Sequence, residues 1–304
     1  MARALLRFDG MATTAARTAL LMAALVALLG IGGWAFGGSS GLALMIVVGL
    51  AINVGAYWFS DRIALAAHRA RPVSRAEAPE LYAIVEQLAA RVGMPMPSIH
   101  VIPSDSPNAF ATGRGPGHAA VAVTEGLFGV VDRRQLTGVL AHELSHVANR
   151  DVLIATVAAG IAGVISTIGY VLQWGLLLGG LGDRNDRRDS PLVALAWVIV
   201  APIVALLLQL AISRSREYGA DTSGARLTGD PEGLADALER LEASSRKRPY
   251  ELAGPATAHL FLVNPLRGRA MLSWLSTHPP IERRVARLRA MSGTSRRSAT
   301  RWPP

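Results

Sequence analysis

Two histidines and a glutamate stand at a spacing that suits metal-dependent hydrolysis, in His142-Glu143-Leu144-Ser145-His146. An α-helix advances about 100° per residue, so side chains four positions apart lie on one face. Both imidazoles can therefore bind one metal ion, and Glu143 projects to the side, where a water molecule on the metal would lie. This H-E-x-x-H pattern is typical of zinc peptidases, and it predicts His142 and His146 as ligands and Glu143 as the general base.

A catalytic zinc site needs a third protein ligand and an open fourth position. The chain has no cysteine, so this ligand must be His, Asp or Glu. A third histidine six positions after His146 would be one solution, but residue 152 is valine. The candidates that remain are the carboxylates and the other histidines, which are His68, His100, His118, His259 and His278.

One pair of carboxylates stands out, because Glu217 and Asp221 are four positions apart, shortly after a long apolar run. On a helix they share one face, so Glu217 can bind the metal while Asp221 hydrogen-bonds the distal N–H of a ligating histidine. The alternative for this pair is a membrane-proximal helix with charges at the lipid headgroups. The expected cofactor is one Zn²⁺ per chain, since two histidines and a glutamate suit zinc.

The elements around these residues are mostly apolar. Hydrophobic residues make up 51% of the 304 residues, and charged residues make up 17%, against a usual share of about 25%. The mean hydropathy is +0.31. These values argue against an ordinary soluble domain.

Uncharged runs occur in two pairs, each joined by a short polar or glycine-rich segment, which predicts about four transmembrane helices in two hairpins. The runs are residues 18–36, 42–59, 152–182 and 192–212. A cleaved signal peptide is the alternative for the first run, and a buried helical hairpin of a soluble domain is the alternative for the second pair.

The net charge of +9 comes from arginines that cluster beside the apolar runs. This placement favours membrane orientation and contact with an anionic lipid bilayer over binding of nucleic acid. Arginines flank both outer ends of the first hairpin, and Arg214 and Arg216 follow the last run. The positive-inside rule therefore predicts a multi-pass protein of the cell (inner) membrane with its polar segments and active site on the cytoplasmic side.

The polar segments predict an α+β domain. A capping box at Ser74 and Glu77 begins a helix that ends at Gly93, and residues 98–102 and 119–124 are expected to be strands. Between them, residues 104–117 are polar and turn-rich, and residues 109–112 are a candidate edge strand that receives an extended substrate by backbone pairing.

The motif helix is expected to begin after Asp132 as N-cap, anchored by Leu136, Leu140, Leu144 and Val147, with its histidine side free for chemistry. Two further helices are predicted, from residue 230 to 244 and from residue 277 to 291. The expected fold is a mainly α integral membrane protein with a cytoplasmic zincin (gluzincin-type) metalloprotease domain. Its divisions are 1–60 and 152–212 (membrane hairpins), 61–151 and 213–291 (the two catalytic parts), and 292–304 (a disordered tail).

The order of these motifs resembles the HtpX family of membrane-bound zinc endopeptidases, which are related to CAAX prenyl proteases. The resemblance is carried by the segments 142–146, 216–221, 108–110 and 278–280. It implies that Glu217 is the third ligand, Asp221 the accompanying aspartate and Glu143 the base, with His278 and Asn108 as candidate donors to the oxyanion. It also implies polypeptide substrates and stress-linked degradation of misfolded or damaged inner-membrane proteins.

Other functions are compatible with parts of the sequence. A dedicated processing peptidase for one membrane substrate would carry the same motif. A non-catalytic membrane scaffold or receptor with a structural zinc would not need Glu143. A transporter would place its sites near the membrane, but no charged residue lies within the apolar runs to mark an ion path.

Overall fold

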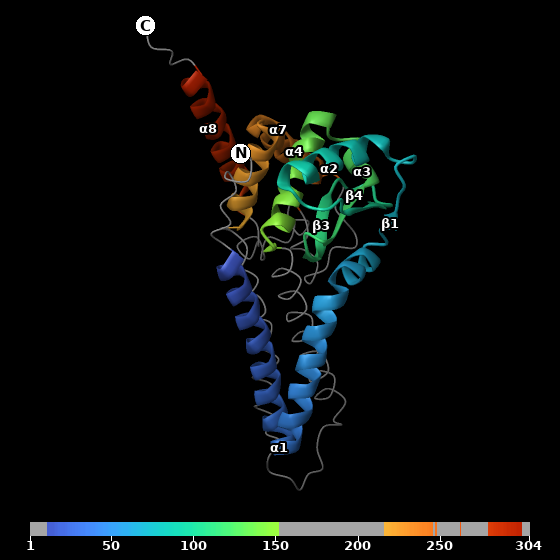
Figure 1. The fold of residues 1–304 in the computed structure, drawn as a ribbon, viewed down its shortest axis with the longest axis vertical. Coiled ribbons are helices and arrows are strands. Elements are labelled where there is room, and N and C mark those ends of the chain that lie inside the picture. Colours follow the sequence, from blue (N-terminus) through green and yellow to red (C-terminus); the bar gives the residue numbers. More distant parts are fainter. Residues whose placement is uncertain (1–10, 152–215, 246, 248–261, 263–278, 300–304) are drawn as a thin grey trace.

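The structure is a computed structural model that describes residues 11–151, 216–245, 247, 262 and 279–299. Figure 1 shows two long helical arms that meet at one end and a mixed domain at the other end. The arms form α1 (Met11–Ala67), which is broken by non-helical backbone at Gly37 and Gly38. Gly38 has a φ of 58°, which favours glycine, so the predicted turn between the first two apolar runs is confirmed.

The two arms of α1 approach each other closely through glycine. A Cβ atom on Gly33 would lie 2.3 Å from the backbone oxygen of Gly41. Among the described residues, Gly37–Phe59 is the one segment long and apolar enough to cross a bilayer. The predicted spans between residues 152 and 212 lie outside the described residues.

A mixed sheet of four strands has the order β1-β2-β4-β3. Its strands are β1 (Arg71–Pro72), β2 (Ser98–Ile102), β3 (Ala109–Gly115) and β4 (His118–Thr124). β2 pairs parallel with β4, and β3 pairs antiparallel with β4. The strands predicted at 98–102 and 119–124 are confirmed, and the predicted edge strand at 109–112 forms the start of β3.

β3 continues further into the glycine-rich segment than the sequence indicated. Gly113 has a φ of 126°, and a Cβ atom there would lie 2.0 Å from the backbone oxygen of His118. Only glycine permits this close return of the chain, and a β-bulge follows at Gly115. The turn between β3 and β4 is therefore tighter than the predicted polar loop. β3 is correspondingly longer, and it forms an edge of the sheet.

α4 (Arg133–Ala148) packs on one face of the sheet, and the other helices pack around it in the main apolar core. These other helices are α2 (Pro79–Val92), the short α3 (Glu125–Phe128), α7 (Pro231–Ser245) and α8 (Ile281–Ala299). The second arm of α1 packs on the opposite face, where Ala64 contacts a small cluster that includes Phe110 and Ala122. The alternation of side chains along β3 explains this division, because Ala109 and Ala111 enter the main core.

Most predicted helix boundaries are confirmed. α2 ends at Gly93, whose φ of 75° is left-handed, and Asp132 caps α4 through a reciprocal box with Gln135. The Ser74–Glu77 box forms too, but α2 begins only at Pro79. α8 runs on to Ala299, beyond the predicted end at 291 and into the predicted disordered tail. Residues 292–299 are mostly serine, glycine and threonine, so intrinsic helix propensity does not explain this extension.

Candidate metal centre

The metal-binding motif lies on α4, in the middle of the domain (Figure 1). His142 and His146 are one helical turn apart, and their Nε2 atoms are 3.2 Å from each other. His142 is 1% exposed and Glu143 is 6% exposed. The helix therefore holds both imidazoles with their Nε2 atoms together inside the protein.

The histidine side of α4 presents the metal-binding groups, as predicted, but other helices also pack closely against it. A Cβ atom on Gly138 would lie 2.8 Å from the backbone nitrogen of Leu234, on α7. A Cβ atom on Gly224 would lie 2.9 Å from the backbone nitrogen of His142. Glycine thus lets two helices approach the backbone of α4, which periodicity of apolar residues does not reveal.

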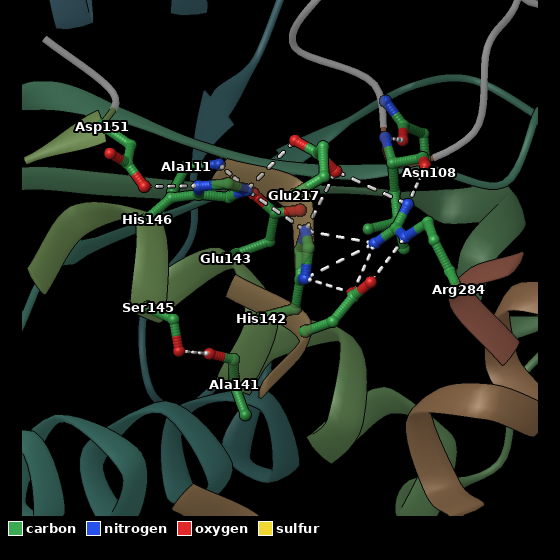
Figure 2. A network of polar contacts seen from close by, with 12 residues as sticks. Asn108, Ala111, Ala141, His142, Glu143, Ser145, His146, Asp151, Glu217 and Arg284 are labelled. Carbon is green, nitrogen blue, oxygen red and sulfur yellow. Dashed lines mark hydrogen bonds and ion pairs between the residues drawn. The ribbon is translucent and has the colours of Figure 1, made fainter. Parts of the chain in front are cut away.

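Glu217 completes the site from a helix that covers residues 216–228 in the described chain. Its Oε2 is 3.7 Å from His142 Nε2, and its Oε1 is 3.4 Å from His146 Nε2. Figure 2 shows the three side chains turned toward one another. Ligands of a tetrahedral zinc, each about 2.1 Å from the ion, lie about 3.4 Å apart. The arrangement therefore fits zinc without movement of the backbone.

No other group of three potential ligands lies together among the described residues. His68 is buried against the ring of Phe110, and His100 contacts Ser98. His118 is exposed at the start of β4. His259 and His278 lie outside the described residues. Of the alternatives that the sequence left open, Glu217 is the one that reaches the two histidines.

A carboxylate contacts the distal nitrogen of each ligating histidine. Asp221 Oδ1 is 3.0 Å from His142 Nδ1, as the sequence predicted, and Asp151 Oδ2 is 3.3 Å from His146 Nδ1. The role of Asp151 was not predicted. Arg150 has a φ of 59°, which turns the chain back at the end of α4 and brings Asp151 to His146. This turn depends on a left-handed conformation that is uncommon for arginine, so helical spacing could not indicate it.

We expect Asp151→Asn to lower zinc affinity by about 10- to 100-fold, because an amide orients His146 less firmly and makes it less basic. Competition with a chromophoric chelator measures the affinity. Asp105→Asn is the matched control, since Asp105 is exposed in the loop before β3. Equal affinities in the two variants would show that Asp151 does not support the ligand.

Arg284 on α8 is a second functional residue that the sequence did not reveal. Its Nε and Nη2 atoms donate to both oxygens of Asp221, at 2.8 and 2.7 Å, and its Nη1 is 3.5 Å from Glu217 Oε2. Nη1 also donates to the backbone oxygen of Leu262, at 3.0 Å. The side chain is fully buried. The neighbouring arginines on α8 are exposed. The amino-acid composition of this helix therefore does not indicate that Arg284 is the buried one.

The charges of the site shift the pKa values of its groups. Burial would raise the pKa of Asp221, but Arg284 outweighs it and lowers this pKa to about 2. Burial lowers the pKa of His142. Burial also raises the pKa of Glu143 to about 7. Glu143 can therefore change its protonation state near neutral pH, as a general base must.

The metal-free protein should release protons when it binds zinc. Burial would lower the pKa of His146, but Asp151 and Glu217 outweigh it and raise this pKa to about 10. At pH 7 this imidazole therefore carries a proton that a metal ion must displace, so affinity should rise with pH up to about 10. Isothermal titration in buffers of different ionisation enthalpy should detect about one released proton. Independence of the heat from the buffer would contradict the prediction.

The remaining site residues lie at the start of the edge strand. Asn108 is buried, its Oδ1 accepts from the backbone nitrogen of Leu262 at 3.3 Å, and its backbone bonds Thr124. Glu143 Oε2 accepts from the backbone nitrogen of Ala111, at 3.0 Å. The structure thus brings β3 directly beside the carboxylate between the two histidines (Figure 2).

Comparison with known proteins agrees with this geometry. The profile of peptidase family M48 matches residues 75–292. A "Protease HtpX homolog" of Syntrophobacter fumaroxidans is 52% identical over 278 residues, which are 90% of this chain and 98% of the relative. A protein of the same description from Thermococcus kodakarensis is 50% identical over 91% of this chain and 95% of the relative.

Among solved structures, the crystal structure of S. mikatae Ste24p is similar, with a TM-score of 0.53. The two chains are 20% identical, and the match covers 91% of this chain and 66% of Ste24p. At this identity the likeness concerns the fold alone.

Proposed function

This chain belongs to peptidase family M48 as a zinc metalloprotease homologous to HtpX, and on that premise we propose that it degrades misfolded or damaged membrane proteins under stress. The observation that carries the proposal is the buried Glu143 carboxylate, placed between three zinc ligands and the edge strand β3. A structural zinc site would not need this carboxylate.

Glu143 is proposed as the general base. His142, His146 and Glu217 would hold the zinc ion, which would supply Lewis acidity to acidify water and polarise a carbonyl group. Glu143 accepts the proton of the attacking water and later donates it to the leaving amine. The N–H of Ala111 fixes one carboxylate oxygen, which leaves the other free to move the proton.

Asn108 and His278 are proposed as donors to the oxyanion. Because Asn108 Oδ1 accepts a hydrogen bond from Leu262, its amide group is held in one orientation and Nδ2 is the donating atom. His278 precedes Pro279 and Pro280, close in sequence to the buried Arg284. Preorganised donors of this kind stabilise charge that develops in the transition state.

The outer edge of β3, with which no other described strand pairs, is proposed to bind the substrate backbone. The backbone oxygen of Asn108 accepts from the nitrogen of Thr124, so Asn108 faces β4. Hydrogen bonding alternates along an antiparallel pair, so the backbone groups of Ala109 and the backbone oxygen of Ala111 point away from β4 and can bind the substrate, while the N–H of Ala111 bonds Glu143. The bond from Ala111 to Glu143 agrees with this direction. A strand edge recognises main chain, and it therefore suits substrates of varied sequence.

The remaining proposals concern the membrane. Residues 1–60 and 152–212 would form hairpins in the inner membrane, in contact with its lipids, and residues 61–151 and 213–291 would form the catalytic domain. The span at Gly37–Phe59 supports this arrangement. The arginines that flank the apolar runs support an active site on the cytoplasmic side.

The function is tested by digestion of casein and of an unfolded membrane protein by the purified chain with zinc. We expect cleavage of both, and its loss when a chelator removes the metal. Cleavage of one membrane protein alone, in an unbiased substrate profile, would instead favour a dedicated processing peptidase. Complete absence of cleavage with bound zinc would favour a scaffold.

A further inference from the structure

The edge strand β3 runs along the second arm of α1, toward the end of the candidate membrane span. At its start, the ring of Phe110 lies 5.1 Å from the ring of His68, just past the end of α1. At its end, Arg114 Cζ lies 4.7 Å from the ring centroid of Trp58, and Nη1 donates to the Trp58 oxygen. β3 therefore runs beside the second arm of α1, and the two segments have opposite chain directions.

The lengths of the two segments agree with this alignment. The four residue steps from Phe110 to Arg114 along the strand extend about 14 Å. The ten residue steps from Trp58 to His68, which lies just past the end of α1, rise about 15 Å. A strand that crossed the helix steeply could not contact it at both points. The edge of the sheet is thus nearly parallel to the membrane-crossing arm.

If the candidate span crosses a bilayer, the end of β3 would lie at the level of the bilayer surface. The candidate span ends at Phe59, next to Trp58, and both side chains are about half exposed. Aromatic residues at this position are typical of the boundary between lipid and water. Ala111, which contacts Glu143, precedes Arg114 by three residues, and the cleaved bond would therefore lie about 10 Å above this level.

A substrate strand that pairs antiparallel to β3 has a fixed direction relative to the membrane. β3 runs toward the bilayer, so the substrate would run away from it, with its N-terminal part at Arg114 and its C-terminal part at Asn108. Antiparallel pairing is the more stable and the more common arrangement, and β3 already pairs in this way with β4.

From this geometry we infer that the protein cuts substrates whose membrane segment lies on the N-terminal side of the cleaved bond, within a few residues of the bilayer. The inference rests on the proposed function, because it assigns a substrate class to the same site. A substrate segment that lies N-terminal to its membrane helix would run toward the bilayer. It would have to reverse its direction to pair antiparallel with β3.

The test uses two single-span substrates that carry an identical cleavable segment, either after or before the span. Each is reconstituted with the full chain in vesicles of phosphatidylcholine and phosphatidylglycerol, with spacers of about 4 and about 20 residues. Only the population whose segment faces the catalytic domain is scored, and cleaved termini are identified by mass spectrometry. The same segment without a span, in solution, reports proteolysis itself.

With the short spacer, we expect the segment after the span to be cut at least about tenfold faster, because the membrane segment then holds it at high effective concentration in the required direction. The difference should shrink with the long spacer, which can loop back. Equal rates or the reverse preference at the short spacer would overturn the inference, although cleavage of the soluble segment would still support the proposed function. Loss of all cleavage, including that of the soluble segment, would overturn both.

Backbone N-methylation of the substrate provides an independent measurement. In an antiparallel pair every second residue directs its N–H toward the partner strand. We expect methylation at alternate positions near the cleaved bond to slow cleavage and methylation at the positions between them to have little effect. A uniform effect at all positions would contradict pairing with β3.

Discussion

Glu143→Gln should abolish proteolysis while the protein keeps its zinc. Glutamine preserves the size of the side chain but cannot accept a proton, and loss of a general base costs about 10²- to 10⁴-fold in rate. The ligands His142, His146 and Glu217 are unchanged, so the bound metal should remain at the level of the unaltered protein. The measurements are casein cleavage and metal content of the same purified sample.

Glu125→Gln is the matched control for this variant, because Glu125 is a half-exposed carboxylate at the start of α3. It should retain full activity. Full activity in Glu143→Gln would remove this residue from the chemistry. Loss of zinc in that variant would instead assign it a role in holding the site together.

Glu217→Ala should lose the metal. Removal of a residue that only supports a ligand costs about 10- to 100-fold in affinity, and removal of a ligand itself should cost more than this. The fold should survive, because Arg284 keeps its two hydrogen bonds to Asp221. Metal analysis after dialysis against a weak chelator, together with circular dichroism, separates loss of zinc from loss of structure.

Glu239→Ala is the control for this second variant. Glu239 pairs with Arg289 at 2.9 Å on the exposed side of α7 and lies away from the metal centre. It should bind zinc as the unaltered protein does. If Glu217→Ala retains one zinc per chain under the same dialysis, another residue must be the third ligand.

The parts of the site that follow local rules could be predicted from sequence. The i,i+4 relation placed His142 with His146, and Glu217 with Asp221, since a helix fixes both pairs. The caps at Asp132 and Gly93 follow from the hydrogen-bonding and backbone preferences of those residue types. Residue type and position made Glu217 a candidate, the resemblance to the HtpX family implied that it is the third ligand, and the structure confirms its contacts.

The parts that depend on long-range packing were not predictable in this way. Asp151 reaches His146 because one arginine adopts a left-handed conformation, and Arg284 enters the site from α8. The cover over the histidine side of α4 depends on close contacts at Gly138 and Gly224. The parallel pairing of β2 with β4 depends on a crossover between strands that are not adjacent in sequence. None of these features produces a periodic pattern of residue types in the sequence.

The position of Arg284 also has a consequence for synthesis of the protein. The three zinc ligands leave the ribosome before α8 does, but the buried carboxylate of Asp221 has no arginine partner until Arg284 arrives. A buried carboxylate without its cation is costly, so the contact of Asp221 with His142 should be less stable before α8 is made. We therefore expect the metal centre to reach its final form only after α8 has been translated.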